Sequence, residues 1–279
     1  MSPRYLPIRL GLAISSLESP ERVYCMLRGY YDGASDGKGH KFITLGGMIA
    51  SVGVWERFEK AWSDALTEYD IHEFHTTDAM ALEYPFLEEH GWNHQKVGEL
   101  VKKLWNVIAQ FRAVKDYSTM SNLTATSCTI DIADYERAKL DIPNLRPKEA
   151  ICVNFCINRW PTDLEKLGEH SGKAELVFDR NEAFLRTIDR VWRSVKKNSR
   201  KSVGWRAQII DIVTRNAITS VGTNNIYPLQ ATDLLAWTIN ELHRNPDRNP
   251  FGHVITTILV EHHKKFYDYE ALNREYPNG

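Results

Sequence analysis

The chain has 279 residues, of which 43% are hydrophobic and 25% are charged, and a chain of this composition can bury the core of an ordinary globular protein. The formal net charge of -1 provides no overall attraction to nucleic acid, so binding of that kind must come from a local basic patch. No apolar run approaches the ~20 residues of a membrane span, and Arg4, Pro7 and Arg9 interrupt the first segment, unlike a secretory signal. We therefore expect a cytoplasmic protein that does not bind a membrane.

The first third of the chain predicts two strands followed by two helices. Apolar runs indicate strands over residues 23–31 and 41–49, and the glycines between them are typical of a hairpin-type connection. Ser51 can cap a helix whose aromatic residues recur at helical spacing, and core packing explains that stripe. A second amphipathic helix is predicted over residues 95–110.

The middle of the chain predicts a strand and two helices. Residues 113–125 alternate loosely between apolar and polar, which favours a third strand. Helices are predicted over residues 132–140 and 147–160, and Pro161 is expected to stop or restart the second. The cysteines form no Cys-x-x-Cys pair, so we expect buried core thiols. They are Cys25, Cys128, Cys152 and Cys156.

The last third begins with a short apolar run over residues 174–178 that predicts a strand and delivers Asp179 at its end. The elements predicted after it are a helix over 182–197, a strand within 207–219, a helix over 228–243 and a helix over 253–267. No repeat and no linker is visible. We therefore expect one α/β domain over residues 1–279, with its core at about 22–245 and a C-terminal helix within 250–279.

Aspartates stand at the ends of four short segments that lie far apart in the chain, Asp32, Asp78, Asp179 and Asp233. Carboxylate oxygens at strand ends are the hard ligands that Mg²⁺ or Mn²⁺ prefers. Asp32 and Asp179 follow runs typical of buried strands, and Asp233 lies in an apolar helical segment where a bare charge would be costly. Asp32, Asp179 and Asp233 are therefore the predicted metal ligands of a two-ion phosphoryl-transfer site.

Each of these residues also has a plain structural explanation. Asp32 stands before a glycine, as turn residues do; Asp179 can cap the next helix, and Asp233 can pair with an arginine. Asp78 fits the N-terminus of a helix equally well. His75 is either a metal ligand, a proton-transfer group or a loop imidazole. The sequence leaves these alternatives open.

The segment that follows Asp179 is strongly basic and contains two tryptophans. Such a segment can follow a phosphate backbone while its aromatic rings stack on bases. A solvated helix end is the alternative explanation. The candidate nucleic-acid-binding residues are Arg190, Arg193, Lys196, Lys197, Arg200, Lys201 and Arg206.

Several motifs between residues 24 and 243 occur together in this chain. They are Tyr31-Asp32, Phe42-Ile-Thr-Leu-Gly-Gly-Met48, Trp55, Phe58, Phe74-His75, Asp78, Val177-Phe178-Asp179 and Pro228-Leu-Gln-Ala-Thr-Asp-Leu-Leu-Ala236. In this combination they resemble the domain-of-unknown-function 3800 family, whose members are considered ribonuclease H-like. The Leu-Gln-Ala-x-Asp-Leu-Leu-Ala segment at 229–236 is the most specific of these motifs.

The resemblance implies a ribonuclease H-like mixed sheet flanked by helices, with helical insertions, and metal-dependent cleavage of nucleic acid. The positions that match the family's acidic and His-containing motifs are Asp32, Asp179, Asp233, Asp78 and His75. The family's first motif reads Asp-Glu-Ser-Gly, whereas this chain has Gly33 in place of the glutamate. Asp36 is an acidic residue close to that gap.

The sequence therefore predicts a nuclease that hydrolyses phosphodiester bonds with Mg²⁺ or Mn²⁺. Its expected catalytic residues are Asp32, Asp78, Asp179, Asp233 and His75. One alternative is a non-catalytic module that binds nucleic acid or protein on the same fold. Another is a small-molecule phosphohydrolase on the same fold.

Overall fold

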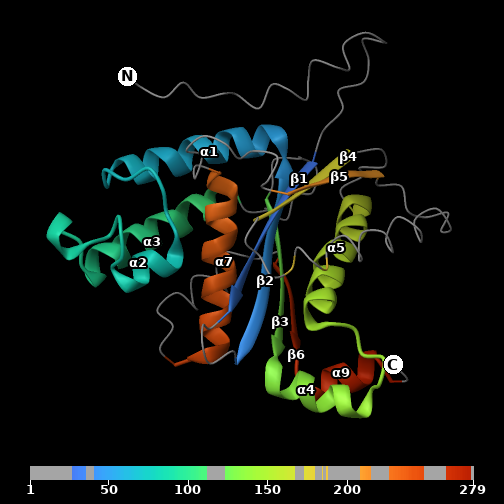
Figure 1. Ribbon diagram of the computed structural model, residues 1–279. Helices are drawn as coiled ribbons and strands as arrows, with labels where there is room; N and C mark the ends of the chain where they lie inside the picture. Colours follow the sequence, from blue (N-terminus) through green and yellow to red (C-terminus); the bar gives the residue numbers. More distant parts are fainter. Residues whose placement is uncertain are drawn as a thin grey trace, which may run out of the picture.

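The structure is a computed structural model of the chain that describes residues 27–35, 41–111, 123–166, 173–179, 184, 187, 208–214, 226–247 and 262–277. Within them, six strands form one sheet in the order β5-β4-β1-β2-β3-β6, and helices cover both of its faces (Figure 1). This arrangement confirms the predicted α/β class with a mixed sheet flanked by helices.

The first two strands, β1 (Leu27–Ser35) and β2 (Phe42–Ser51), are antiparallel neighbours, as predicted. Strand β1 continues past its apolar run, so Asp32 lies inside the strand, opposite Gly46 of β2. The expectation that Asp32 ends the strand was therefore wrong, because backbone pairing with β2 extends beyond the apolar residues to Ser35. All ten residues of β2 are buried, which fits a central strand covered on both faces.

The other strands extend the sheet on both sides of this pair. On one side, β4 (Lys173–Phe178) runs parallel to β1, and β5 (Gln208–Thr214) runs parallel to β4. On the other side, β3 (Thr124–Asp131) is antiparallel to β2, and β6 (His262–Tyr267) runs parallel to β3.

Two of the predicted strand and helix boundaries were wrong. The third strand was expected over 113–125, but β3 spans Thr124–Asp131, while residues 112–122 lie outside the described part of the chain. A helix was expected over 253–267, but residues 262–267 form β6, followed by α9 (Tyr269–Glu275). Both strands are rich in polar side chains, and pairing with a neighbouring strand decides their conformation more than local pattern does.

The expected interruption at Pro161, either a stop or a restart of the helix, was also wrong, because α5 (Lys148–Lys166) continues through it as one helix. Proline removes one backbone hydrogen bond and costs a helix interior about 3 kcal/mol. The helix offsets that loss by burying an apolar face, which includes Ile151, Val153 and Ile157.

Two hydrophobic clusters occupy the two faces of the sheet. On one face, α7 (Tyr227–Arg244) packs on the strands, and α1 (Val52–Thr67), α3 (His94–Gln110) and the short α2 (Thr76–Ala81) lie beside it, with a 3-10 turn at Glu88–His90 (Figure 1). We call this the α7 face. The opposite face is covered by α5, with α4 (Ile132–Asp141) and α9 at one end.

The cysteines for which the structure gives a position confirm the predicted core thiols. Cys128, Cys152 and Cys156 are buried and free on the face that α5 covers. Cys25 lies outside the described residues. Burial raises the pKa of the Cys156 thiol, so it is a neutral core group at physiological pH.

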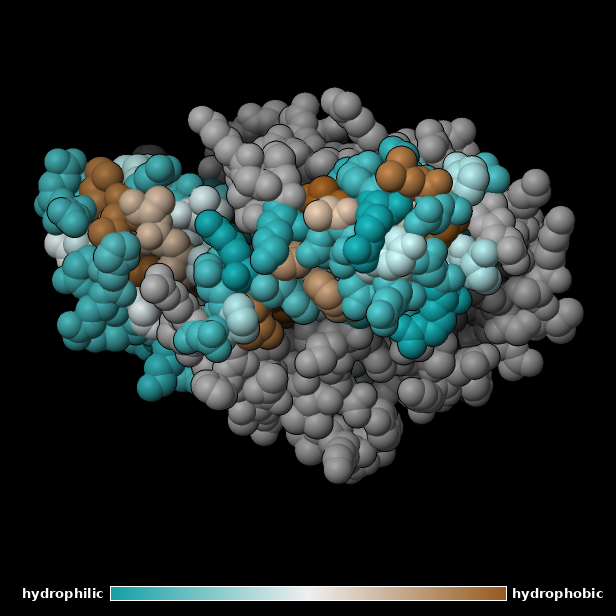
Figure 2. All heavy atoms as spheres, turned by 90° about the horizontal axis from the view of Figure 1, so that it is seen from below, coloured by the Kyte–Doolittle hydropathy of each residue, from teal (hydrophilic) through white to brown (hydrophobic). Residues whose placement is uncertain are grey.

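The described surface is mostly hydrophilic. Seen from below, its hydrophobic residues form small, separate groups (Figure 2). Among the described residues, the strongly exposed large hydrophobic side chains are Tyr84, at 74%, and Leu140, at 83%. No helix in the described ranges combines the length and the apolar character needed to cross a membrane.

Candidate metal centre

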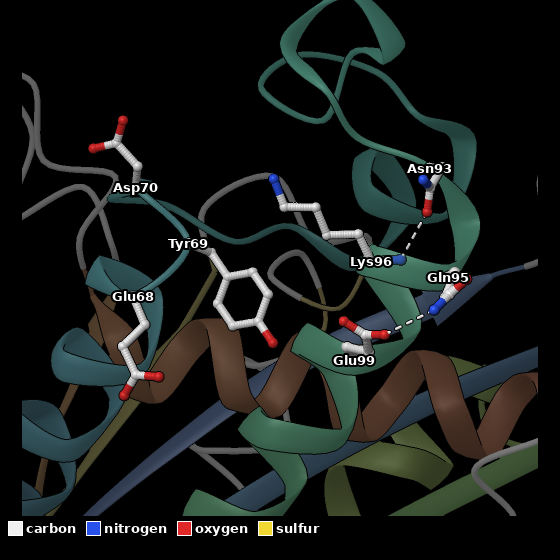
Figure 3. A pocket seen from close by; sticks show the side chains of 7 residues that line it. All are labelled: Glu68, Tyr69, Asp70, Asn93, Gln95, Lys96 and Glu99. Carbon is white, nitrogen blue, oxygen red and sulfur yellow. Dashed lines mark hydrogen bonds between the residues drawn. The ribbon is translucent and has the colours of Figure 1, made fainter.

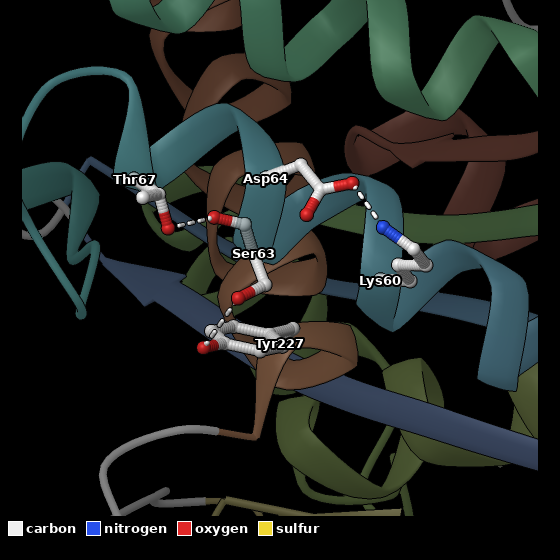
Figure 4. A network of polar contacts seen from close by, with 5 residues as sticks. All are labelled: Lys60, Ser63, Asp64, Thr67 and Tyr227. Atoms are coloured by element: carbon white, nitrogen blue, oxygen red, sulfur yellow. Dashed lines mark hydrogen bonds and ion pairs between the residues drawn. The ribbon is translucent and has the colours of Figure 1, made fainter. Parts of the chain in front are cut away.

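Helix α7 is fixed on the sheet by polar contacts along its whole length. Near its first turn, the Tyr227 hydroxyl donates to Ser63 Oγ of α1 at 3.3 Å (Figure 4). One turn further, Trp62 Nε1 donates to Gln230 Oε1 at 2.9 Å in the core. Towards the other end, Asn240 Oδ1 accepts from Thr44 of β2 at 3.5 Å. These contacts set both the rotation and the register of α7 on the sheet.

Helix α7 comes close to the sheet at Gly46. A Cβ atom at this glycine would lie 3.1 Å from both the Cβ and the backbone nitrogen of Ala236. Gly46 is the cross-strand partner of Asp32, and Asp233 lies one helical turn before Ala236. The glycine therefore brings the helix segment that carries Asp233 down to the strands at the level of Asp32.

Asp32 and Asp179 lie next to each other on neighbouring parallel strands. Tyr31 of β1 is in register with Phe178 of β4, and the Asp179 N–H continues the ladder by donating to the Tyr31 carbonyl at 3.2 Å. The two aspartates are the next residues in this register, and neighbouring strands lie about 4.8 Å apart.

Both of these aspartates belong to the α7 face. Tyr30 and Val177 pack in the cluster on that face, whereas the Tyr31 and Phe178 rings stack on the opposite face at 4.8 Å. Because side chains alternate along a strand, Asp32 and Asp179 share the face of Tyr30 and Val177. Asp32 is 7% exposed, and its Oδ1 accepts the N–H of Gly33 at 2.9 Å.

Asp233 is the third carboxylate of this face, and it is also 7% exposed. Its Oδ2 accepts the backbone N–H of Thr76 at 2.7 Å. Burial raises its pKa above the ordinary value; the His75 imidazole and the hydrogen bond from Thr76 oppose that rise, and the Asp179 carboxylate adds to it. Asp233 thus lies within electrostatic reach of both Asp179 and His75.

The Oδ1 atom of Asp233 accepts no hydrogen bond from any residue in the described part of the chain. A carboxylate has about four acceptor sites, and a buried negative charge without compensation costs folding free energy. The arginine partner that the sequence left open for Asp233 is not found among the described residues. Oδ1 is not one of the fully buried unpartnered atoms among the described residues, so solvent, and with it a cation, has access to this oxygen.

His75 and Asp78 lie at the rim of the site. His75 is the residue before α2, and Asp78 lies in the first turn of that helix, which agrees with the helix N-terminus that the sequence left open for Asp78. His75 Nδ1 and Asp78 Oδ2 are 3.5 Å apart, and their side chains are 53% and 38% exposed. Both side chains are accessible to solvent and to a substrate.

The donor set fits a hard divalent cation in its chemistry. Three carboxylates on one face supply oxygen ligands of the kind that Mg²⁺ and Mn²⁺ prefer, and these ions retain water as further ligands. In the described residues, no three acidic, histidine or cysteine side chains are grouped closely enough to hold an ion as they stand. Strand register brings Asp32 and Asp179 together on one face of the sheet, and Asp233 lies within electrostatic reach of Asp179.

Several predicted residues lie outside the part of the chain that the structure describes. They are Asp36 and the seven basic residues Arg190, Arg193, Lys196, Lys197, Arg200, Lys201 and Arg206. Sequence reasoning also missed two residues that shape the site, Thr76 and Gly46. The only signal for Gly46 was the glycine pair in a buried strand, which often marks a close backbone approach; Thr76 gave none beyond its position next to His75.

A pocket of about 560 Å³ lies away from these carboxylates. It lies between the end of α1 and the first turns of α3 (Figure 3). Its lining residues are Glu68, Tyr69, Asp70, Asn93, Gln95, Lys96 and Glu99. Their polar groups serve local structure: Asn93 caps α3 by accepting the Lys96 N–H at 2.9 Å, and Gln95 donates to Glu99 at 3.1 Å.

No protein-family model and no curated protein matches this chain.

Proposed function

We propose that this protein is a divalent-metal-dependent phosphodiesterase, specifically a nuclease, with its site at Asp32, Asp179 and Asp233. The observation that carries the proposal is the state of Asp233. Its carboxylate is buried, one oxygen is held by the protein, the other accepts no hydrogen bond from a described residue, and a second carboxylate lies within electrostatic reach. A divalent cation would compensate that charge and would explain why the carboxylate is kept there.

The proposal includes a ribonuclease H-like fold and membership of the domain-of-unknown-function 3800 family. Two observations support it: the mixed sheet flanked by helices, and the location of the motif aspartates on one face of that sheet. Gly33 is an exception to the family pattern, and in this chain its N–H holds Asp32 Oδ1 at 2.9 Å.

Each residue has a definite task in this proposal. Asp32, Asp179 and Asp233 would hold Mg²⁺ or Mn²⁺, which when bound supplies Lewis-acid activation of the phosphoryl group and of water. His75 would transfer a proton: Asp78 engages its Nδ1, so Nε2 is the atom that would protonate the leaving oxygen. In this proposal, Asp78 orients the imidazole through that contact.

The proposed substrate is nucleic acid, and the basic segment from Arg190 to Arg206 is the proposed contact for its phosphate backbone. Support for this part comes from the sequence: the segment combines closely spaced cations with two tryptophans. A cytoplasmic location completes the proposal.

Asp179→Asn is the direct test. We expect the variant to lose at least about 100-fold in Mn²⁺-dependent cleavage of single- and double-stranded DNA and RNA, because removing a ligand charge weakens ion binding. Asp70→Asn is the matched control, since Asp70 is exposed and has a φ of 57° that asparagine also adopts. Circular dichroism of both variants should then verify that they are folded.

The result also separates the alternatives. Equal cleavage by Asp179→Asn and Asp70→Asn would eliminate the proposed site. Turnover of nucleotides or phosphate esters without cleavage of polymers would identify a small-molecule phosphohydrolase. Binding of nucleic acid or protein that EDTA does not change, without any turnover, would identify a binding module.

A further inference from the structure

We infer that the Thr76 hydroxyl is a positioning group for the metal centre: together with the Thr76 N–H, which holds Oδ2 of Asp233, it orients that carboxylate so that the other oxygen binds an ion. The inference rests on the proposed function. Sequence motifs gave no sign of this role, because Thr76 lies 157 positions from Asp233 and meets it only in the folded protein.

Thr76 has two donors beside the Asp233 carboxylate. Its N–H donates to Oδ2 at 2.7 Å. Its hydroxyl is close enough to favour the charged form of that carboxyl group, yet it forms no hydrogen bond of normal geometry with any described group. Thr76 is completely buried, at 0% exposure, so water cannot satisfy this hydroxyl.

A buried hydroxyl without a hydrogen-bond partner normally lowers the stability of the folded protein. A buried polar group without a partner costs about 1–3 kcal/mol, and valine would fill the same space without that cost. Because the Thr76 hydroxyl lies beside the Asp233 carboxylate, rotation of the hydroxyl and a small shift of the carboxylate would let it donate to Asp233. Both donors of Thr76 would then bind the same carboxylate and fix its orientation towards an ion, which is how outer-shell groups orient metal ligands.

Thr76 also links the two halves of the proposed site. His75 precedes it and Asp78 follows two residues later, so the contact between Thr76 and Asp233 fixes the α2 segment against α7. The proton-transfer pair and the metal ligands are thereby held in one relative position.

The test is the Mn²⁺ dissociation constant of the full-length chain, measured by calorimetry. Thr76→Val should bind Mn²⁺ about tenfold more weakly than the wild type, the lower end of the usual effect of outer-shell substitutions. Thr76→Ser should restore binding to within about twofold, because it keeps the hydroxyl. Thr126→Val is the matched control, since Thr126 is also fully buried with an unpartnered hydroxyl. It pairs with Gly47 of β2 and, like Cys128 two residues later on β3, belongs to the face opposite α7.

The outcomes distinguish this inference from the proposed function. Wild-type affinity in Thr76→Val overturns the inference and leaves the nuclease proposal in place. Equal weakening in Thr76→Val and Thr126→Val also overturns it, because the loss would then reflect general packing. A wild-type protein that binds no Mn²⁺ contradicts the proposed function and the inference together.

Discussion

At the scale of single residues, Asp233 is a buried acidic side chain with few partners among the described residues. Gln230 and Asn240, two other buried polar residues of α7, have partners on α1 and β2. Asp233 has a single backbone donor, from Thr76. Functional sites commonly retain groups of this kind at some cost in stability.

Substitution of Asp233 by asparagine should therefore stabilise the metal-free protein. The pKa of Asp233 is raised by burial, so the stability linked to this carboxyl group is complete below its unfolded pKa, near 4, and is lost as the pH rises through its folded pKa. Asparagine is neutral at every pH and keeps an oxygen for the Thr76 N–H. In EDTA, we expect the melting temperature of Asp233→Asn to exceed that of the wild type by a few degrees at pH 8 and by less at pH 5.

Calorimetric melting curves at the two pH values measure this difference, and about 2–4 °C corresponds to each kcal/mol in a chain of this size. Adding Mn²⁺ should raise the melting temperature of the wild type but not that of Asp233→Asn. A variant less stable than the wild type at both pH values would show that Asp233 serves mainly as a stabilising cap for α2.

At the scale of elements, the position of α7 on the strands decides whether the carboxylates meet. The helix approaches closely enough only because residue 46 has no side chain. A glycine usually weakens the interior of a strand. At position 46 it allows α7 to pack close to β2.

Gly46→Ala should disturb both folding and the metal site. The added Cβ would lie 3.1 Å from the backbone nitrogen of Ala236, and because a helix backbone cannot yield as a flexible side chain can, we expect a loss of about 1–3 kcal/mol. The displaced helix should also bind Mn²⁺ more weakly. Gly53→Ala is the control, since nothing lies within 4 Å of its added Cβ on α1, and alanine favours a helix by about 1 kcal/mol.

Chemical denaturation with a parallel Mn²⁺ titration compares the two variants. Gly46→Ala that keeps wild-type stability and wild-type ion affinity would show that α7 does not need this close approach.

The elements also show what the sequence can and cannot predict. Strong periodicity correctly predicted α1 and α3, since burial of one helix face is a local pattern. Strand β6, with its His-His-Lys-Lys start, was assigned to a helix because its conformation depends on pairing with β3. The continuation of α5 past Pro161 likewise depends on packing against the sheet, which no local rule contains.

At the scale of the whole molecule, the sequence singled out Asp32, Asp179 and Asp233 as candidates but did not show how they come together. The buried runs before Asp32 and Asp179 indicated two strands, but their adjacency comes from the parallel pairing of β1 with β4 across more than a hundred intervening residues. The contact between Thr76 and Asp233 was likewise invisible in the sequence, because it joins α2 to α7. Long-range topology is the part of this site that residue patterns do not encode.

The central claim is that Asp32, Asp179 and Asp233 share divalent ions. Anomalous diffraction from crystals soaked in Mn²⁺ tests it most directly. The account predicts an anomalous peak between these three side chains on the α7 face, with carboxylate oxygens about 2.0–2.3 Å from the ion. Full-occupancy Mn²⁺ elsewhere on the protein, with none at these aspartates, would contradict it.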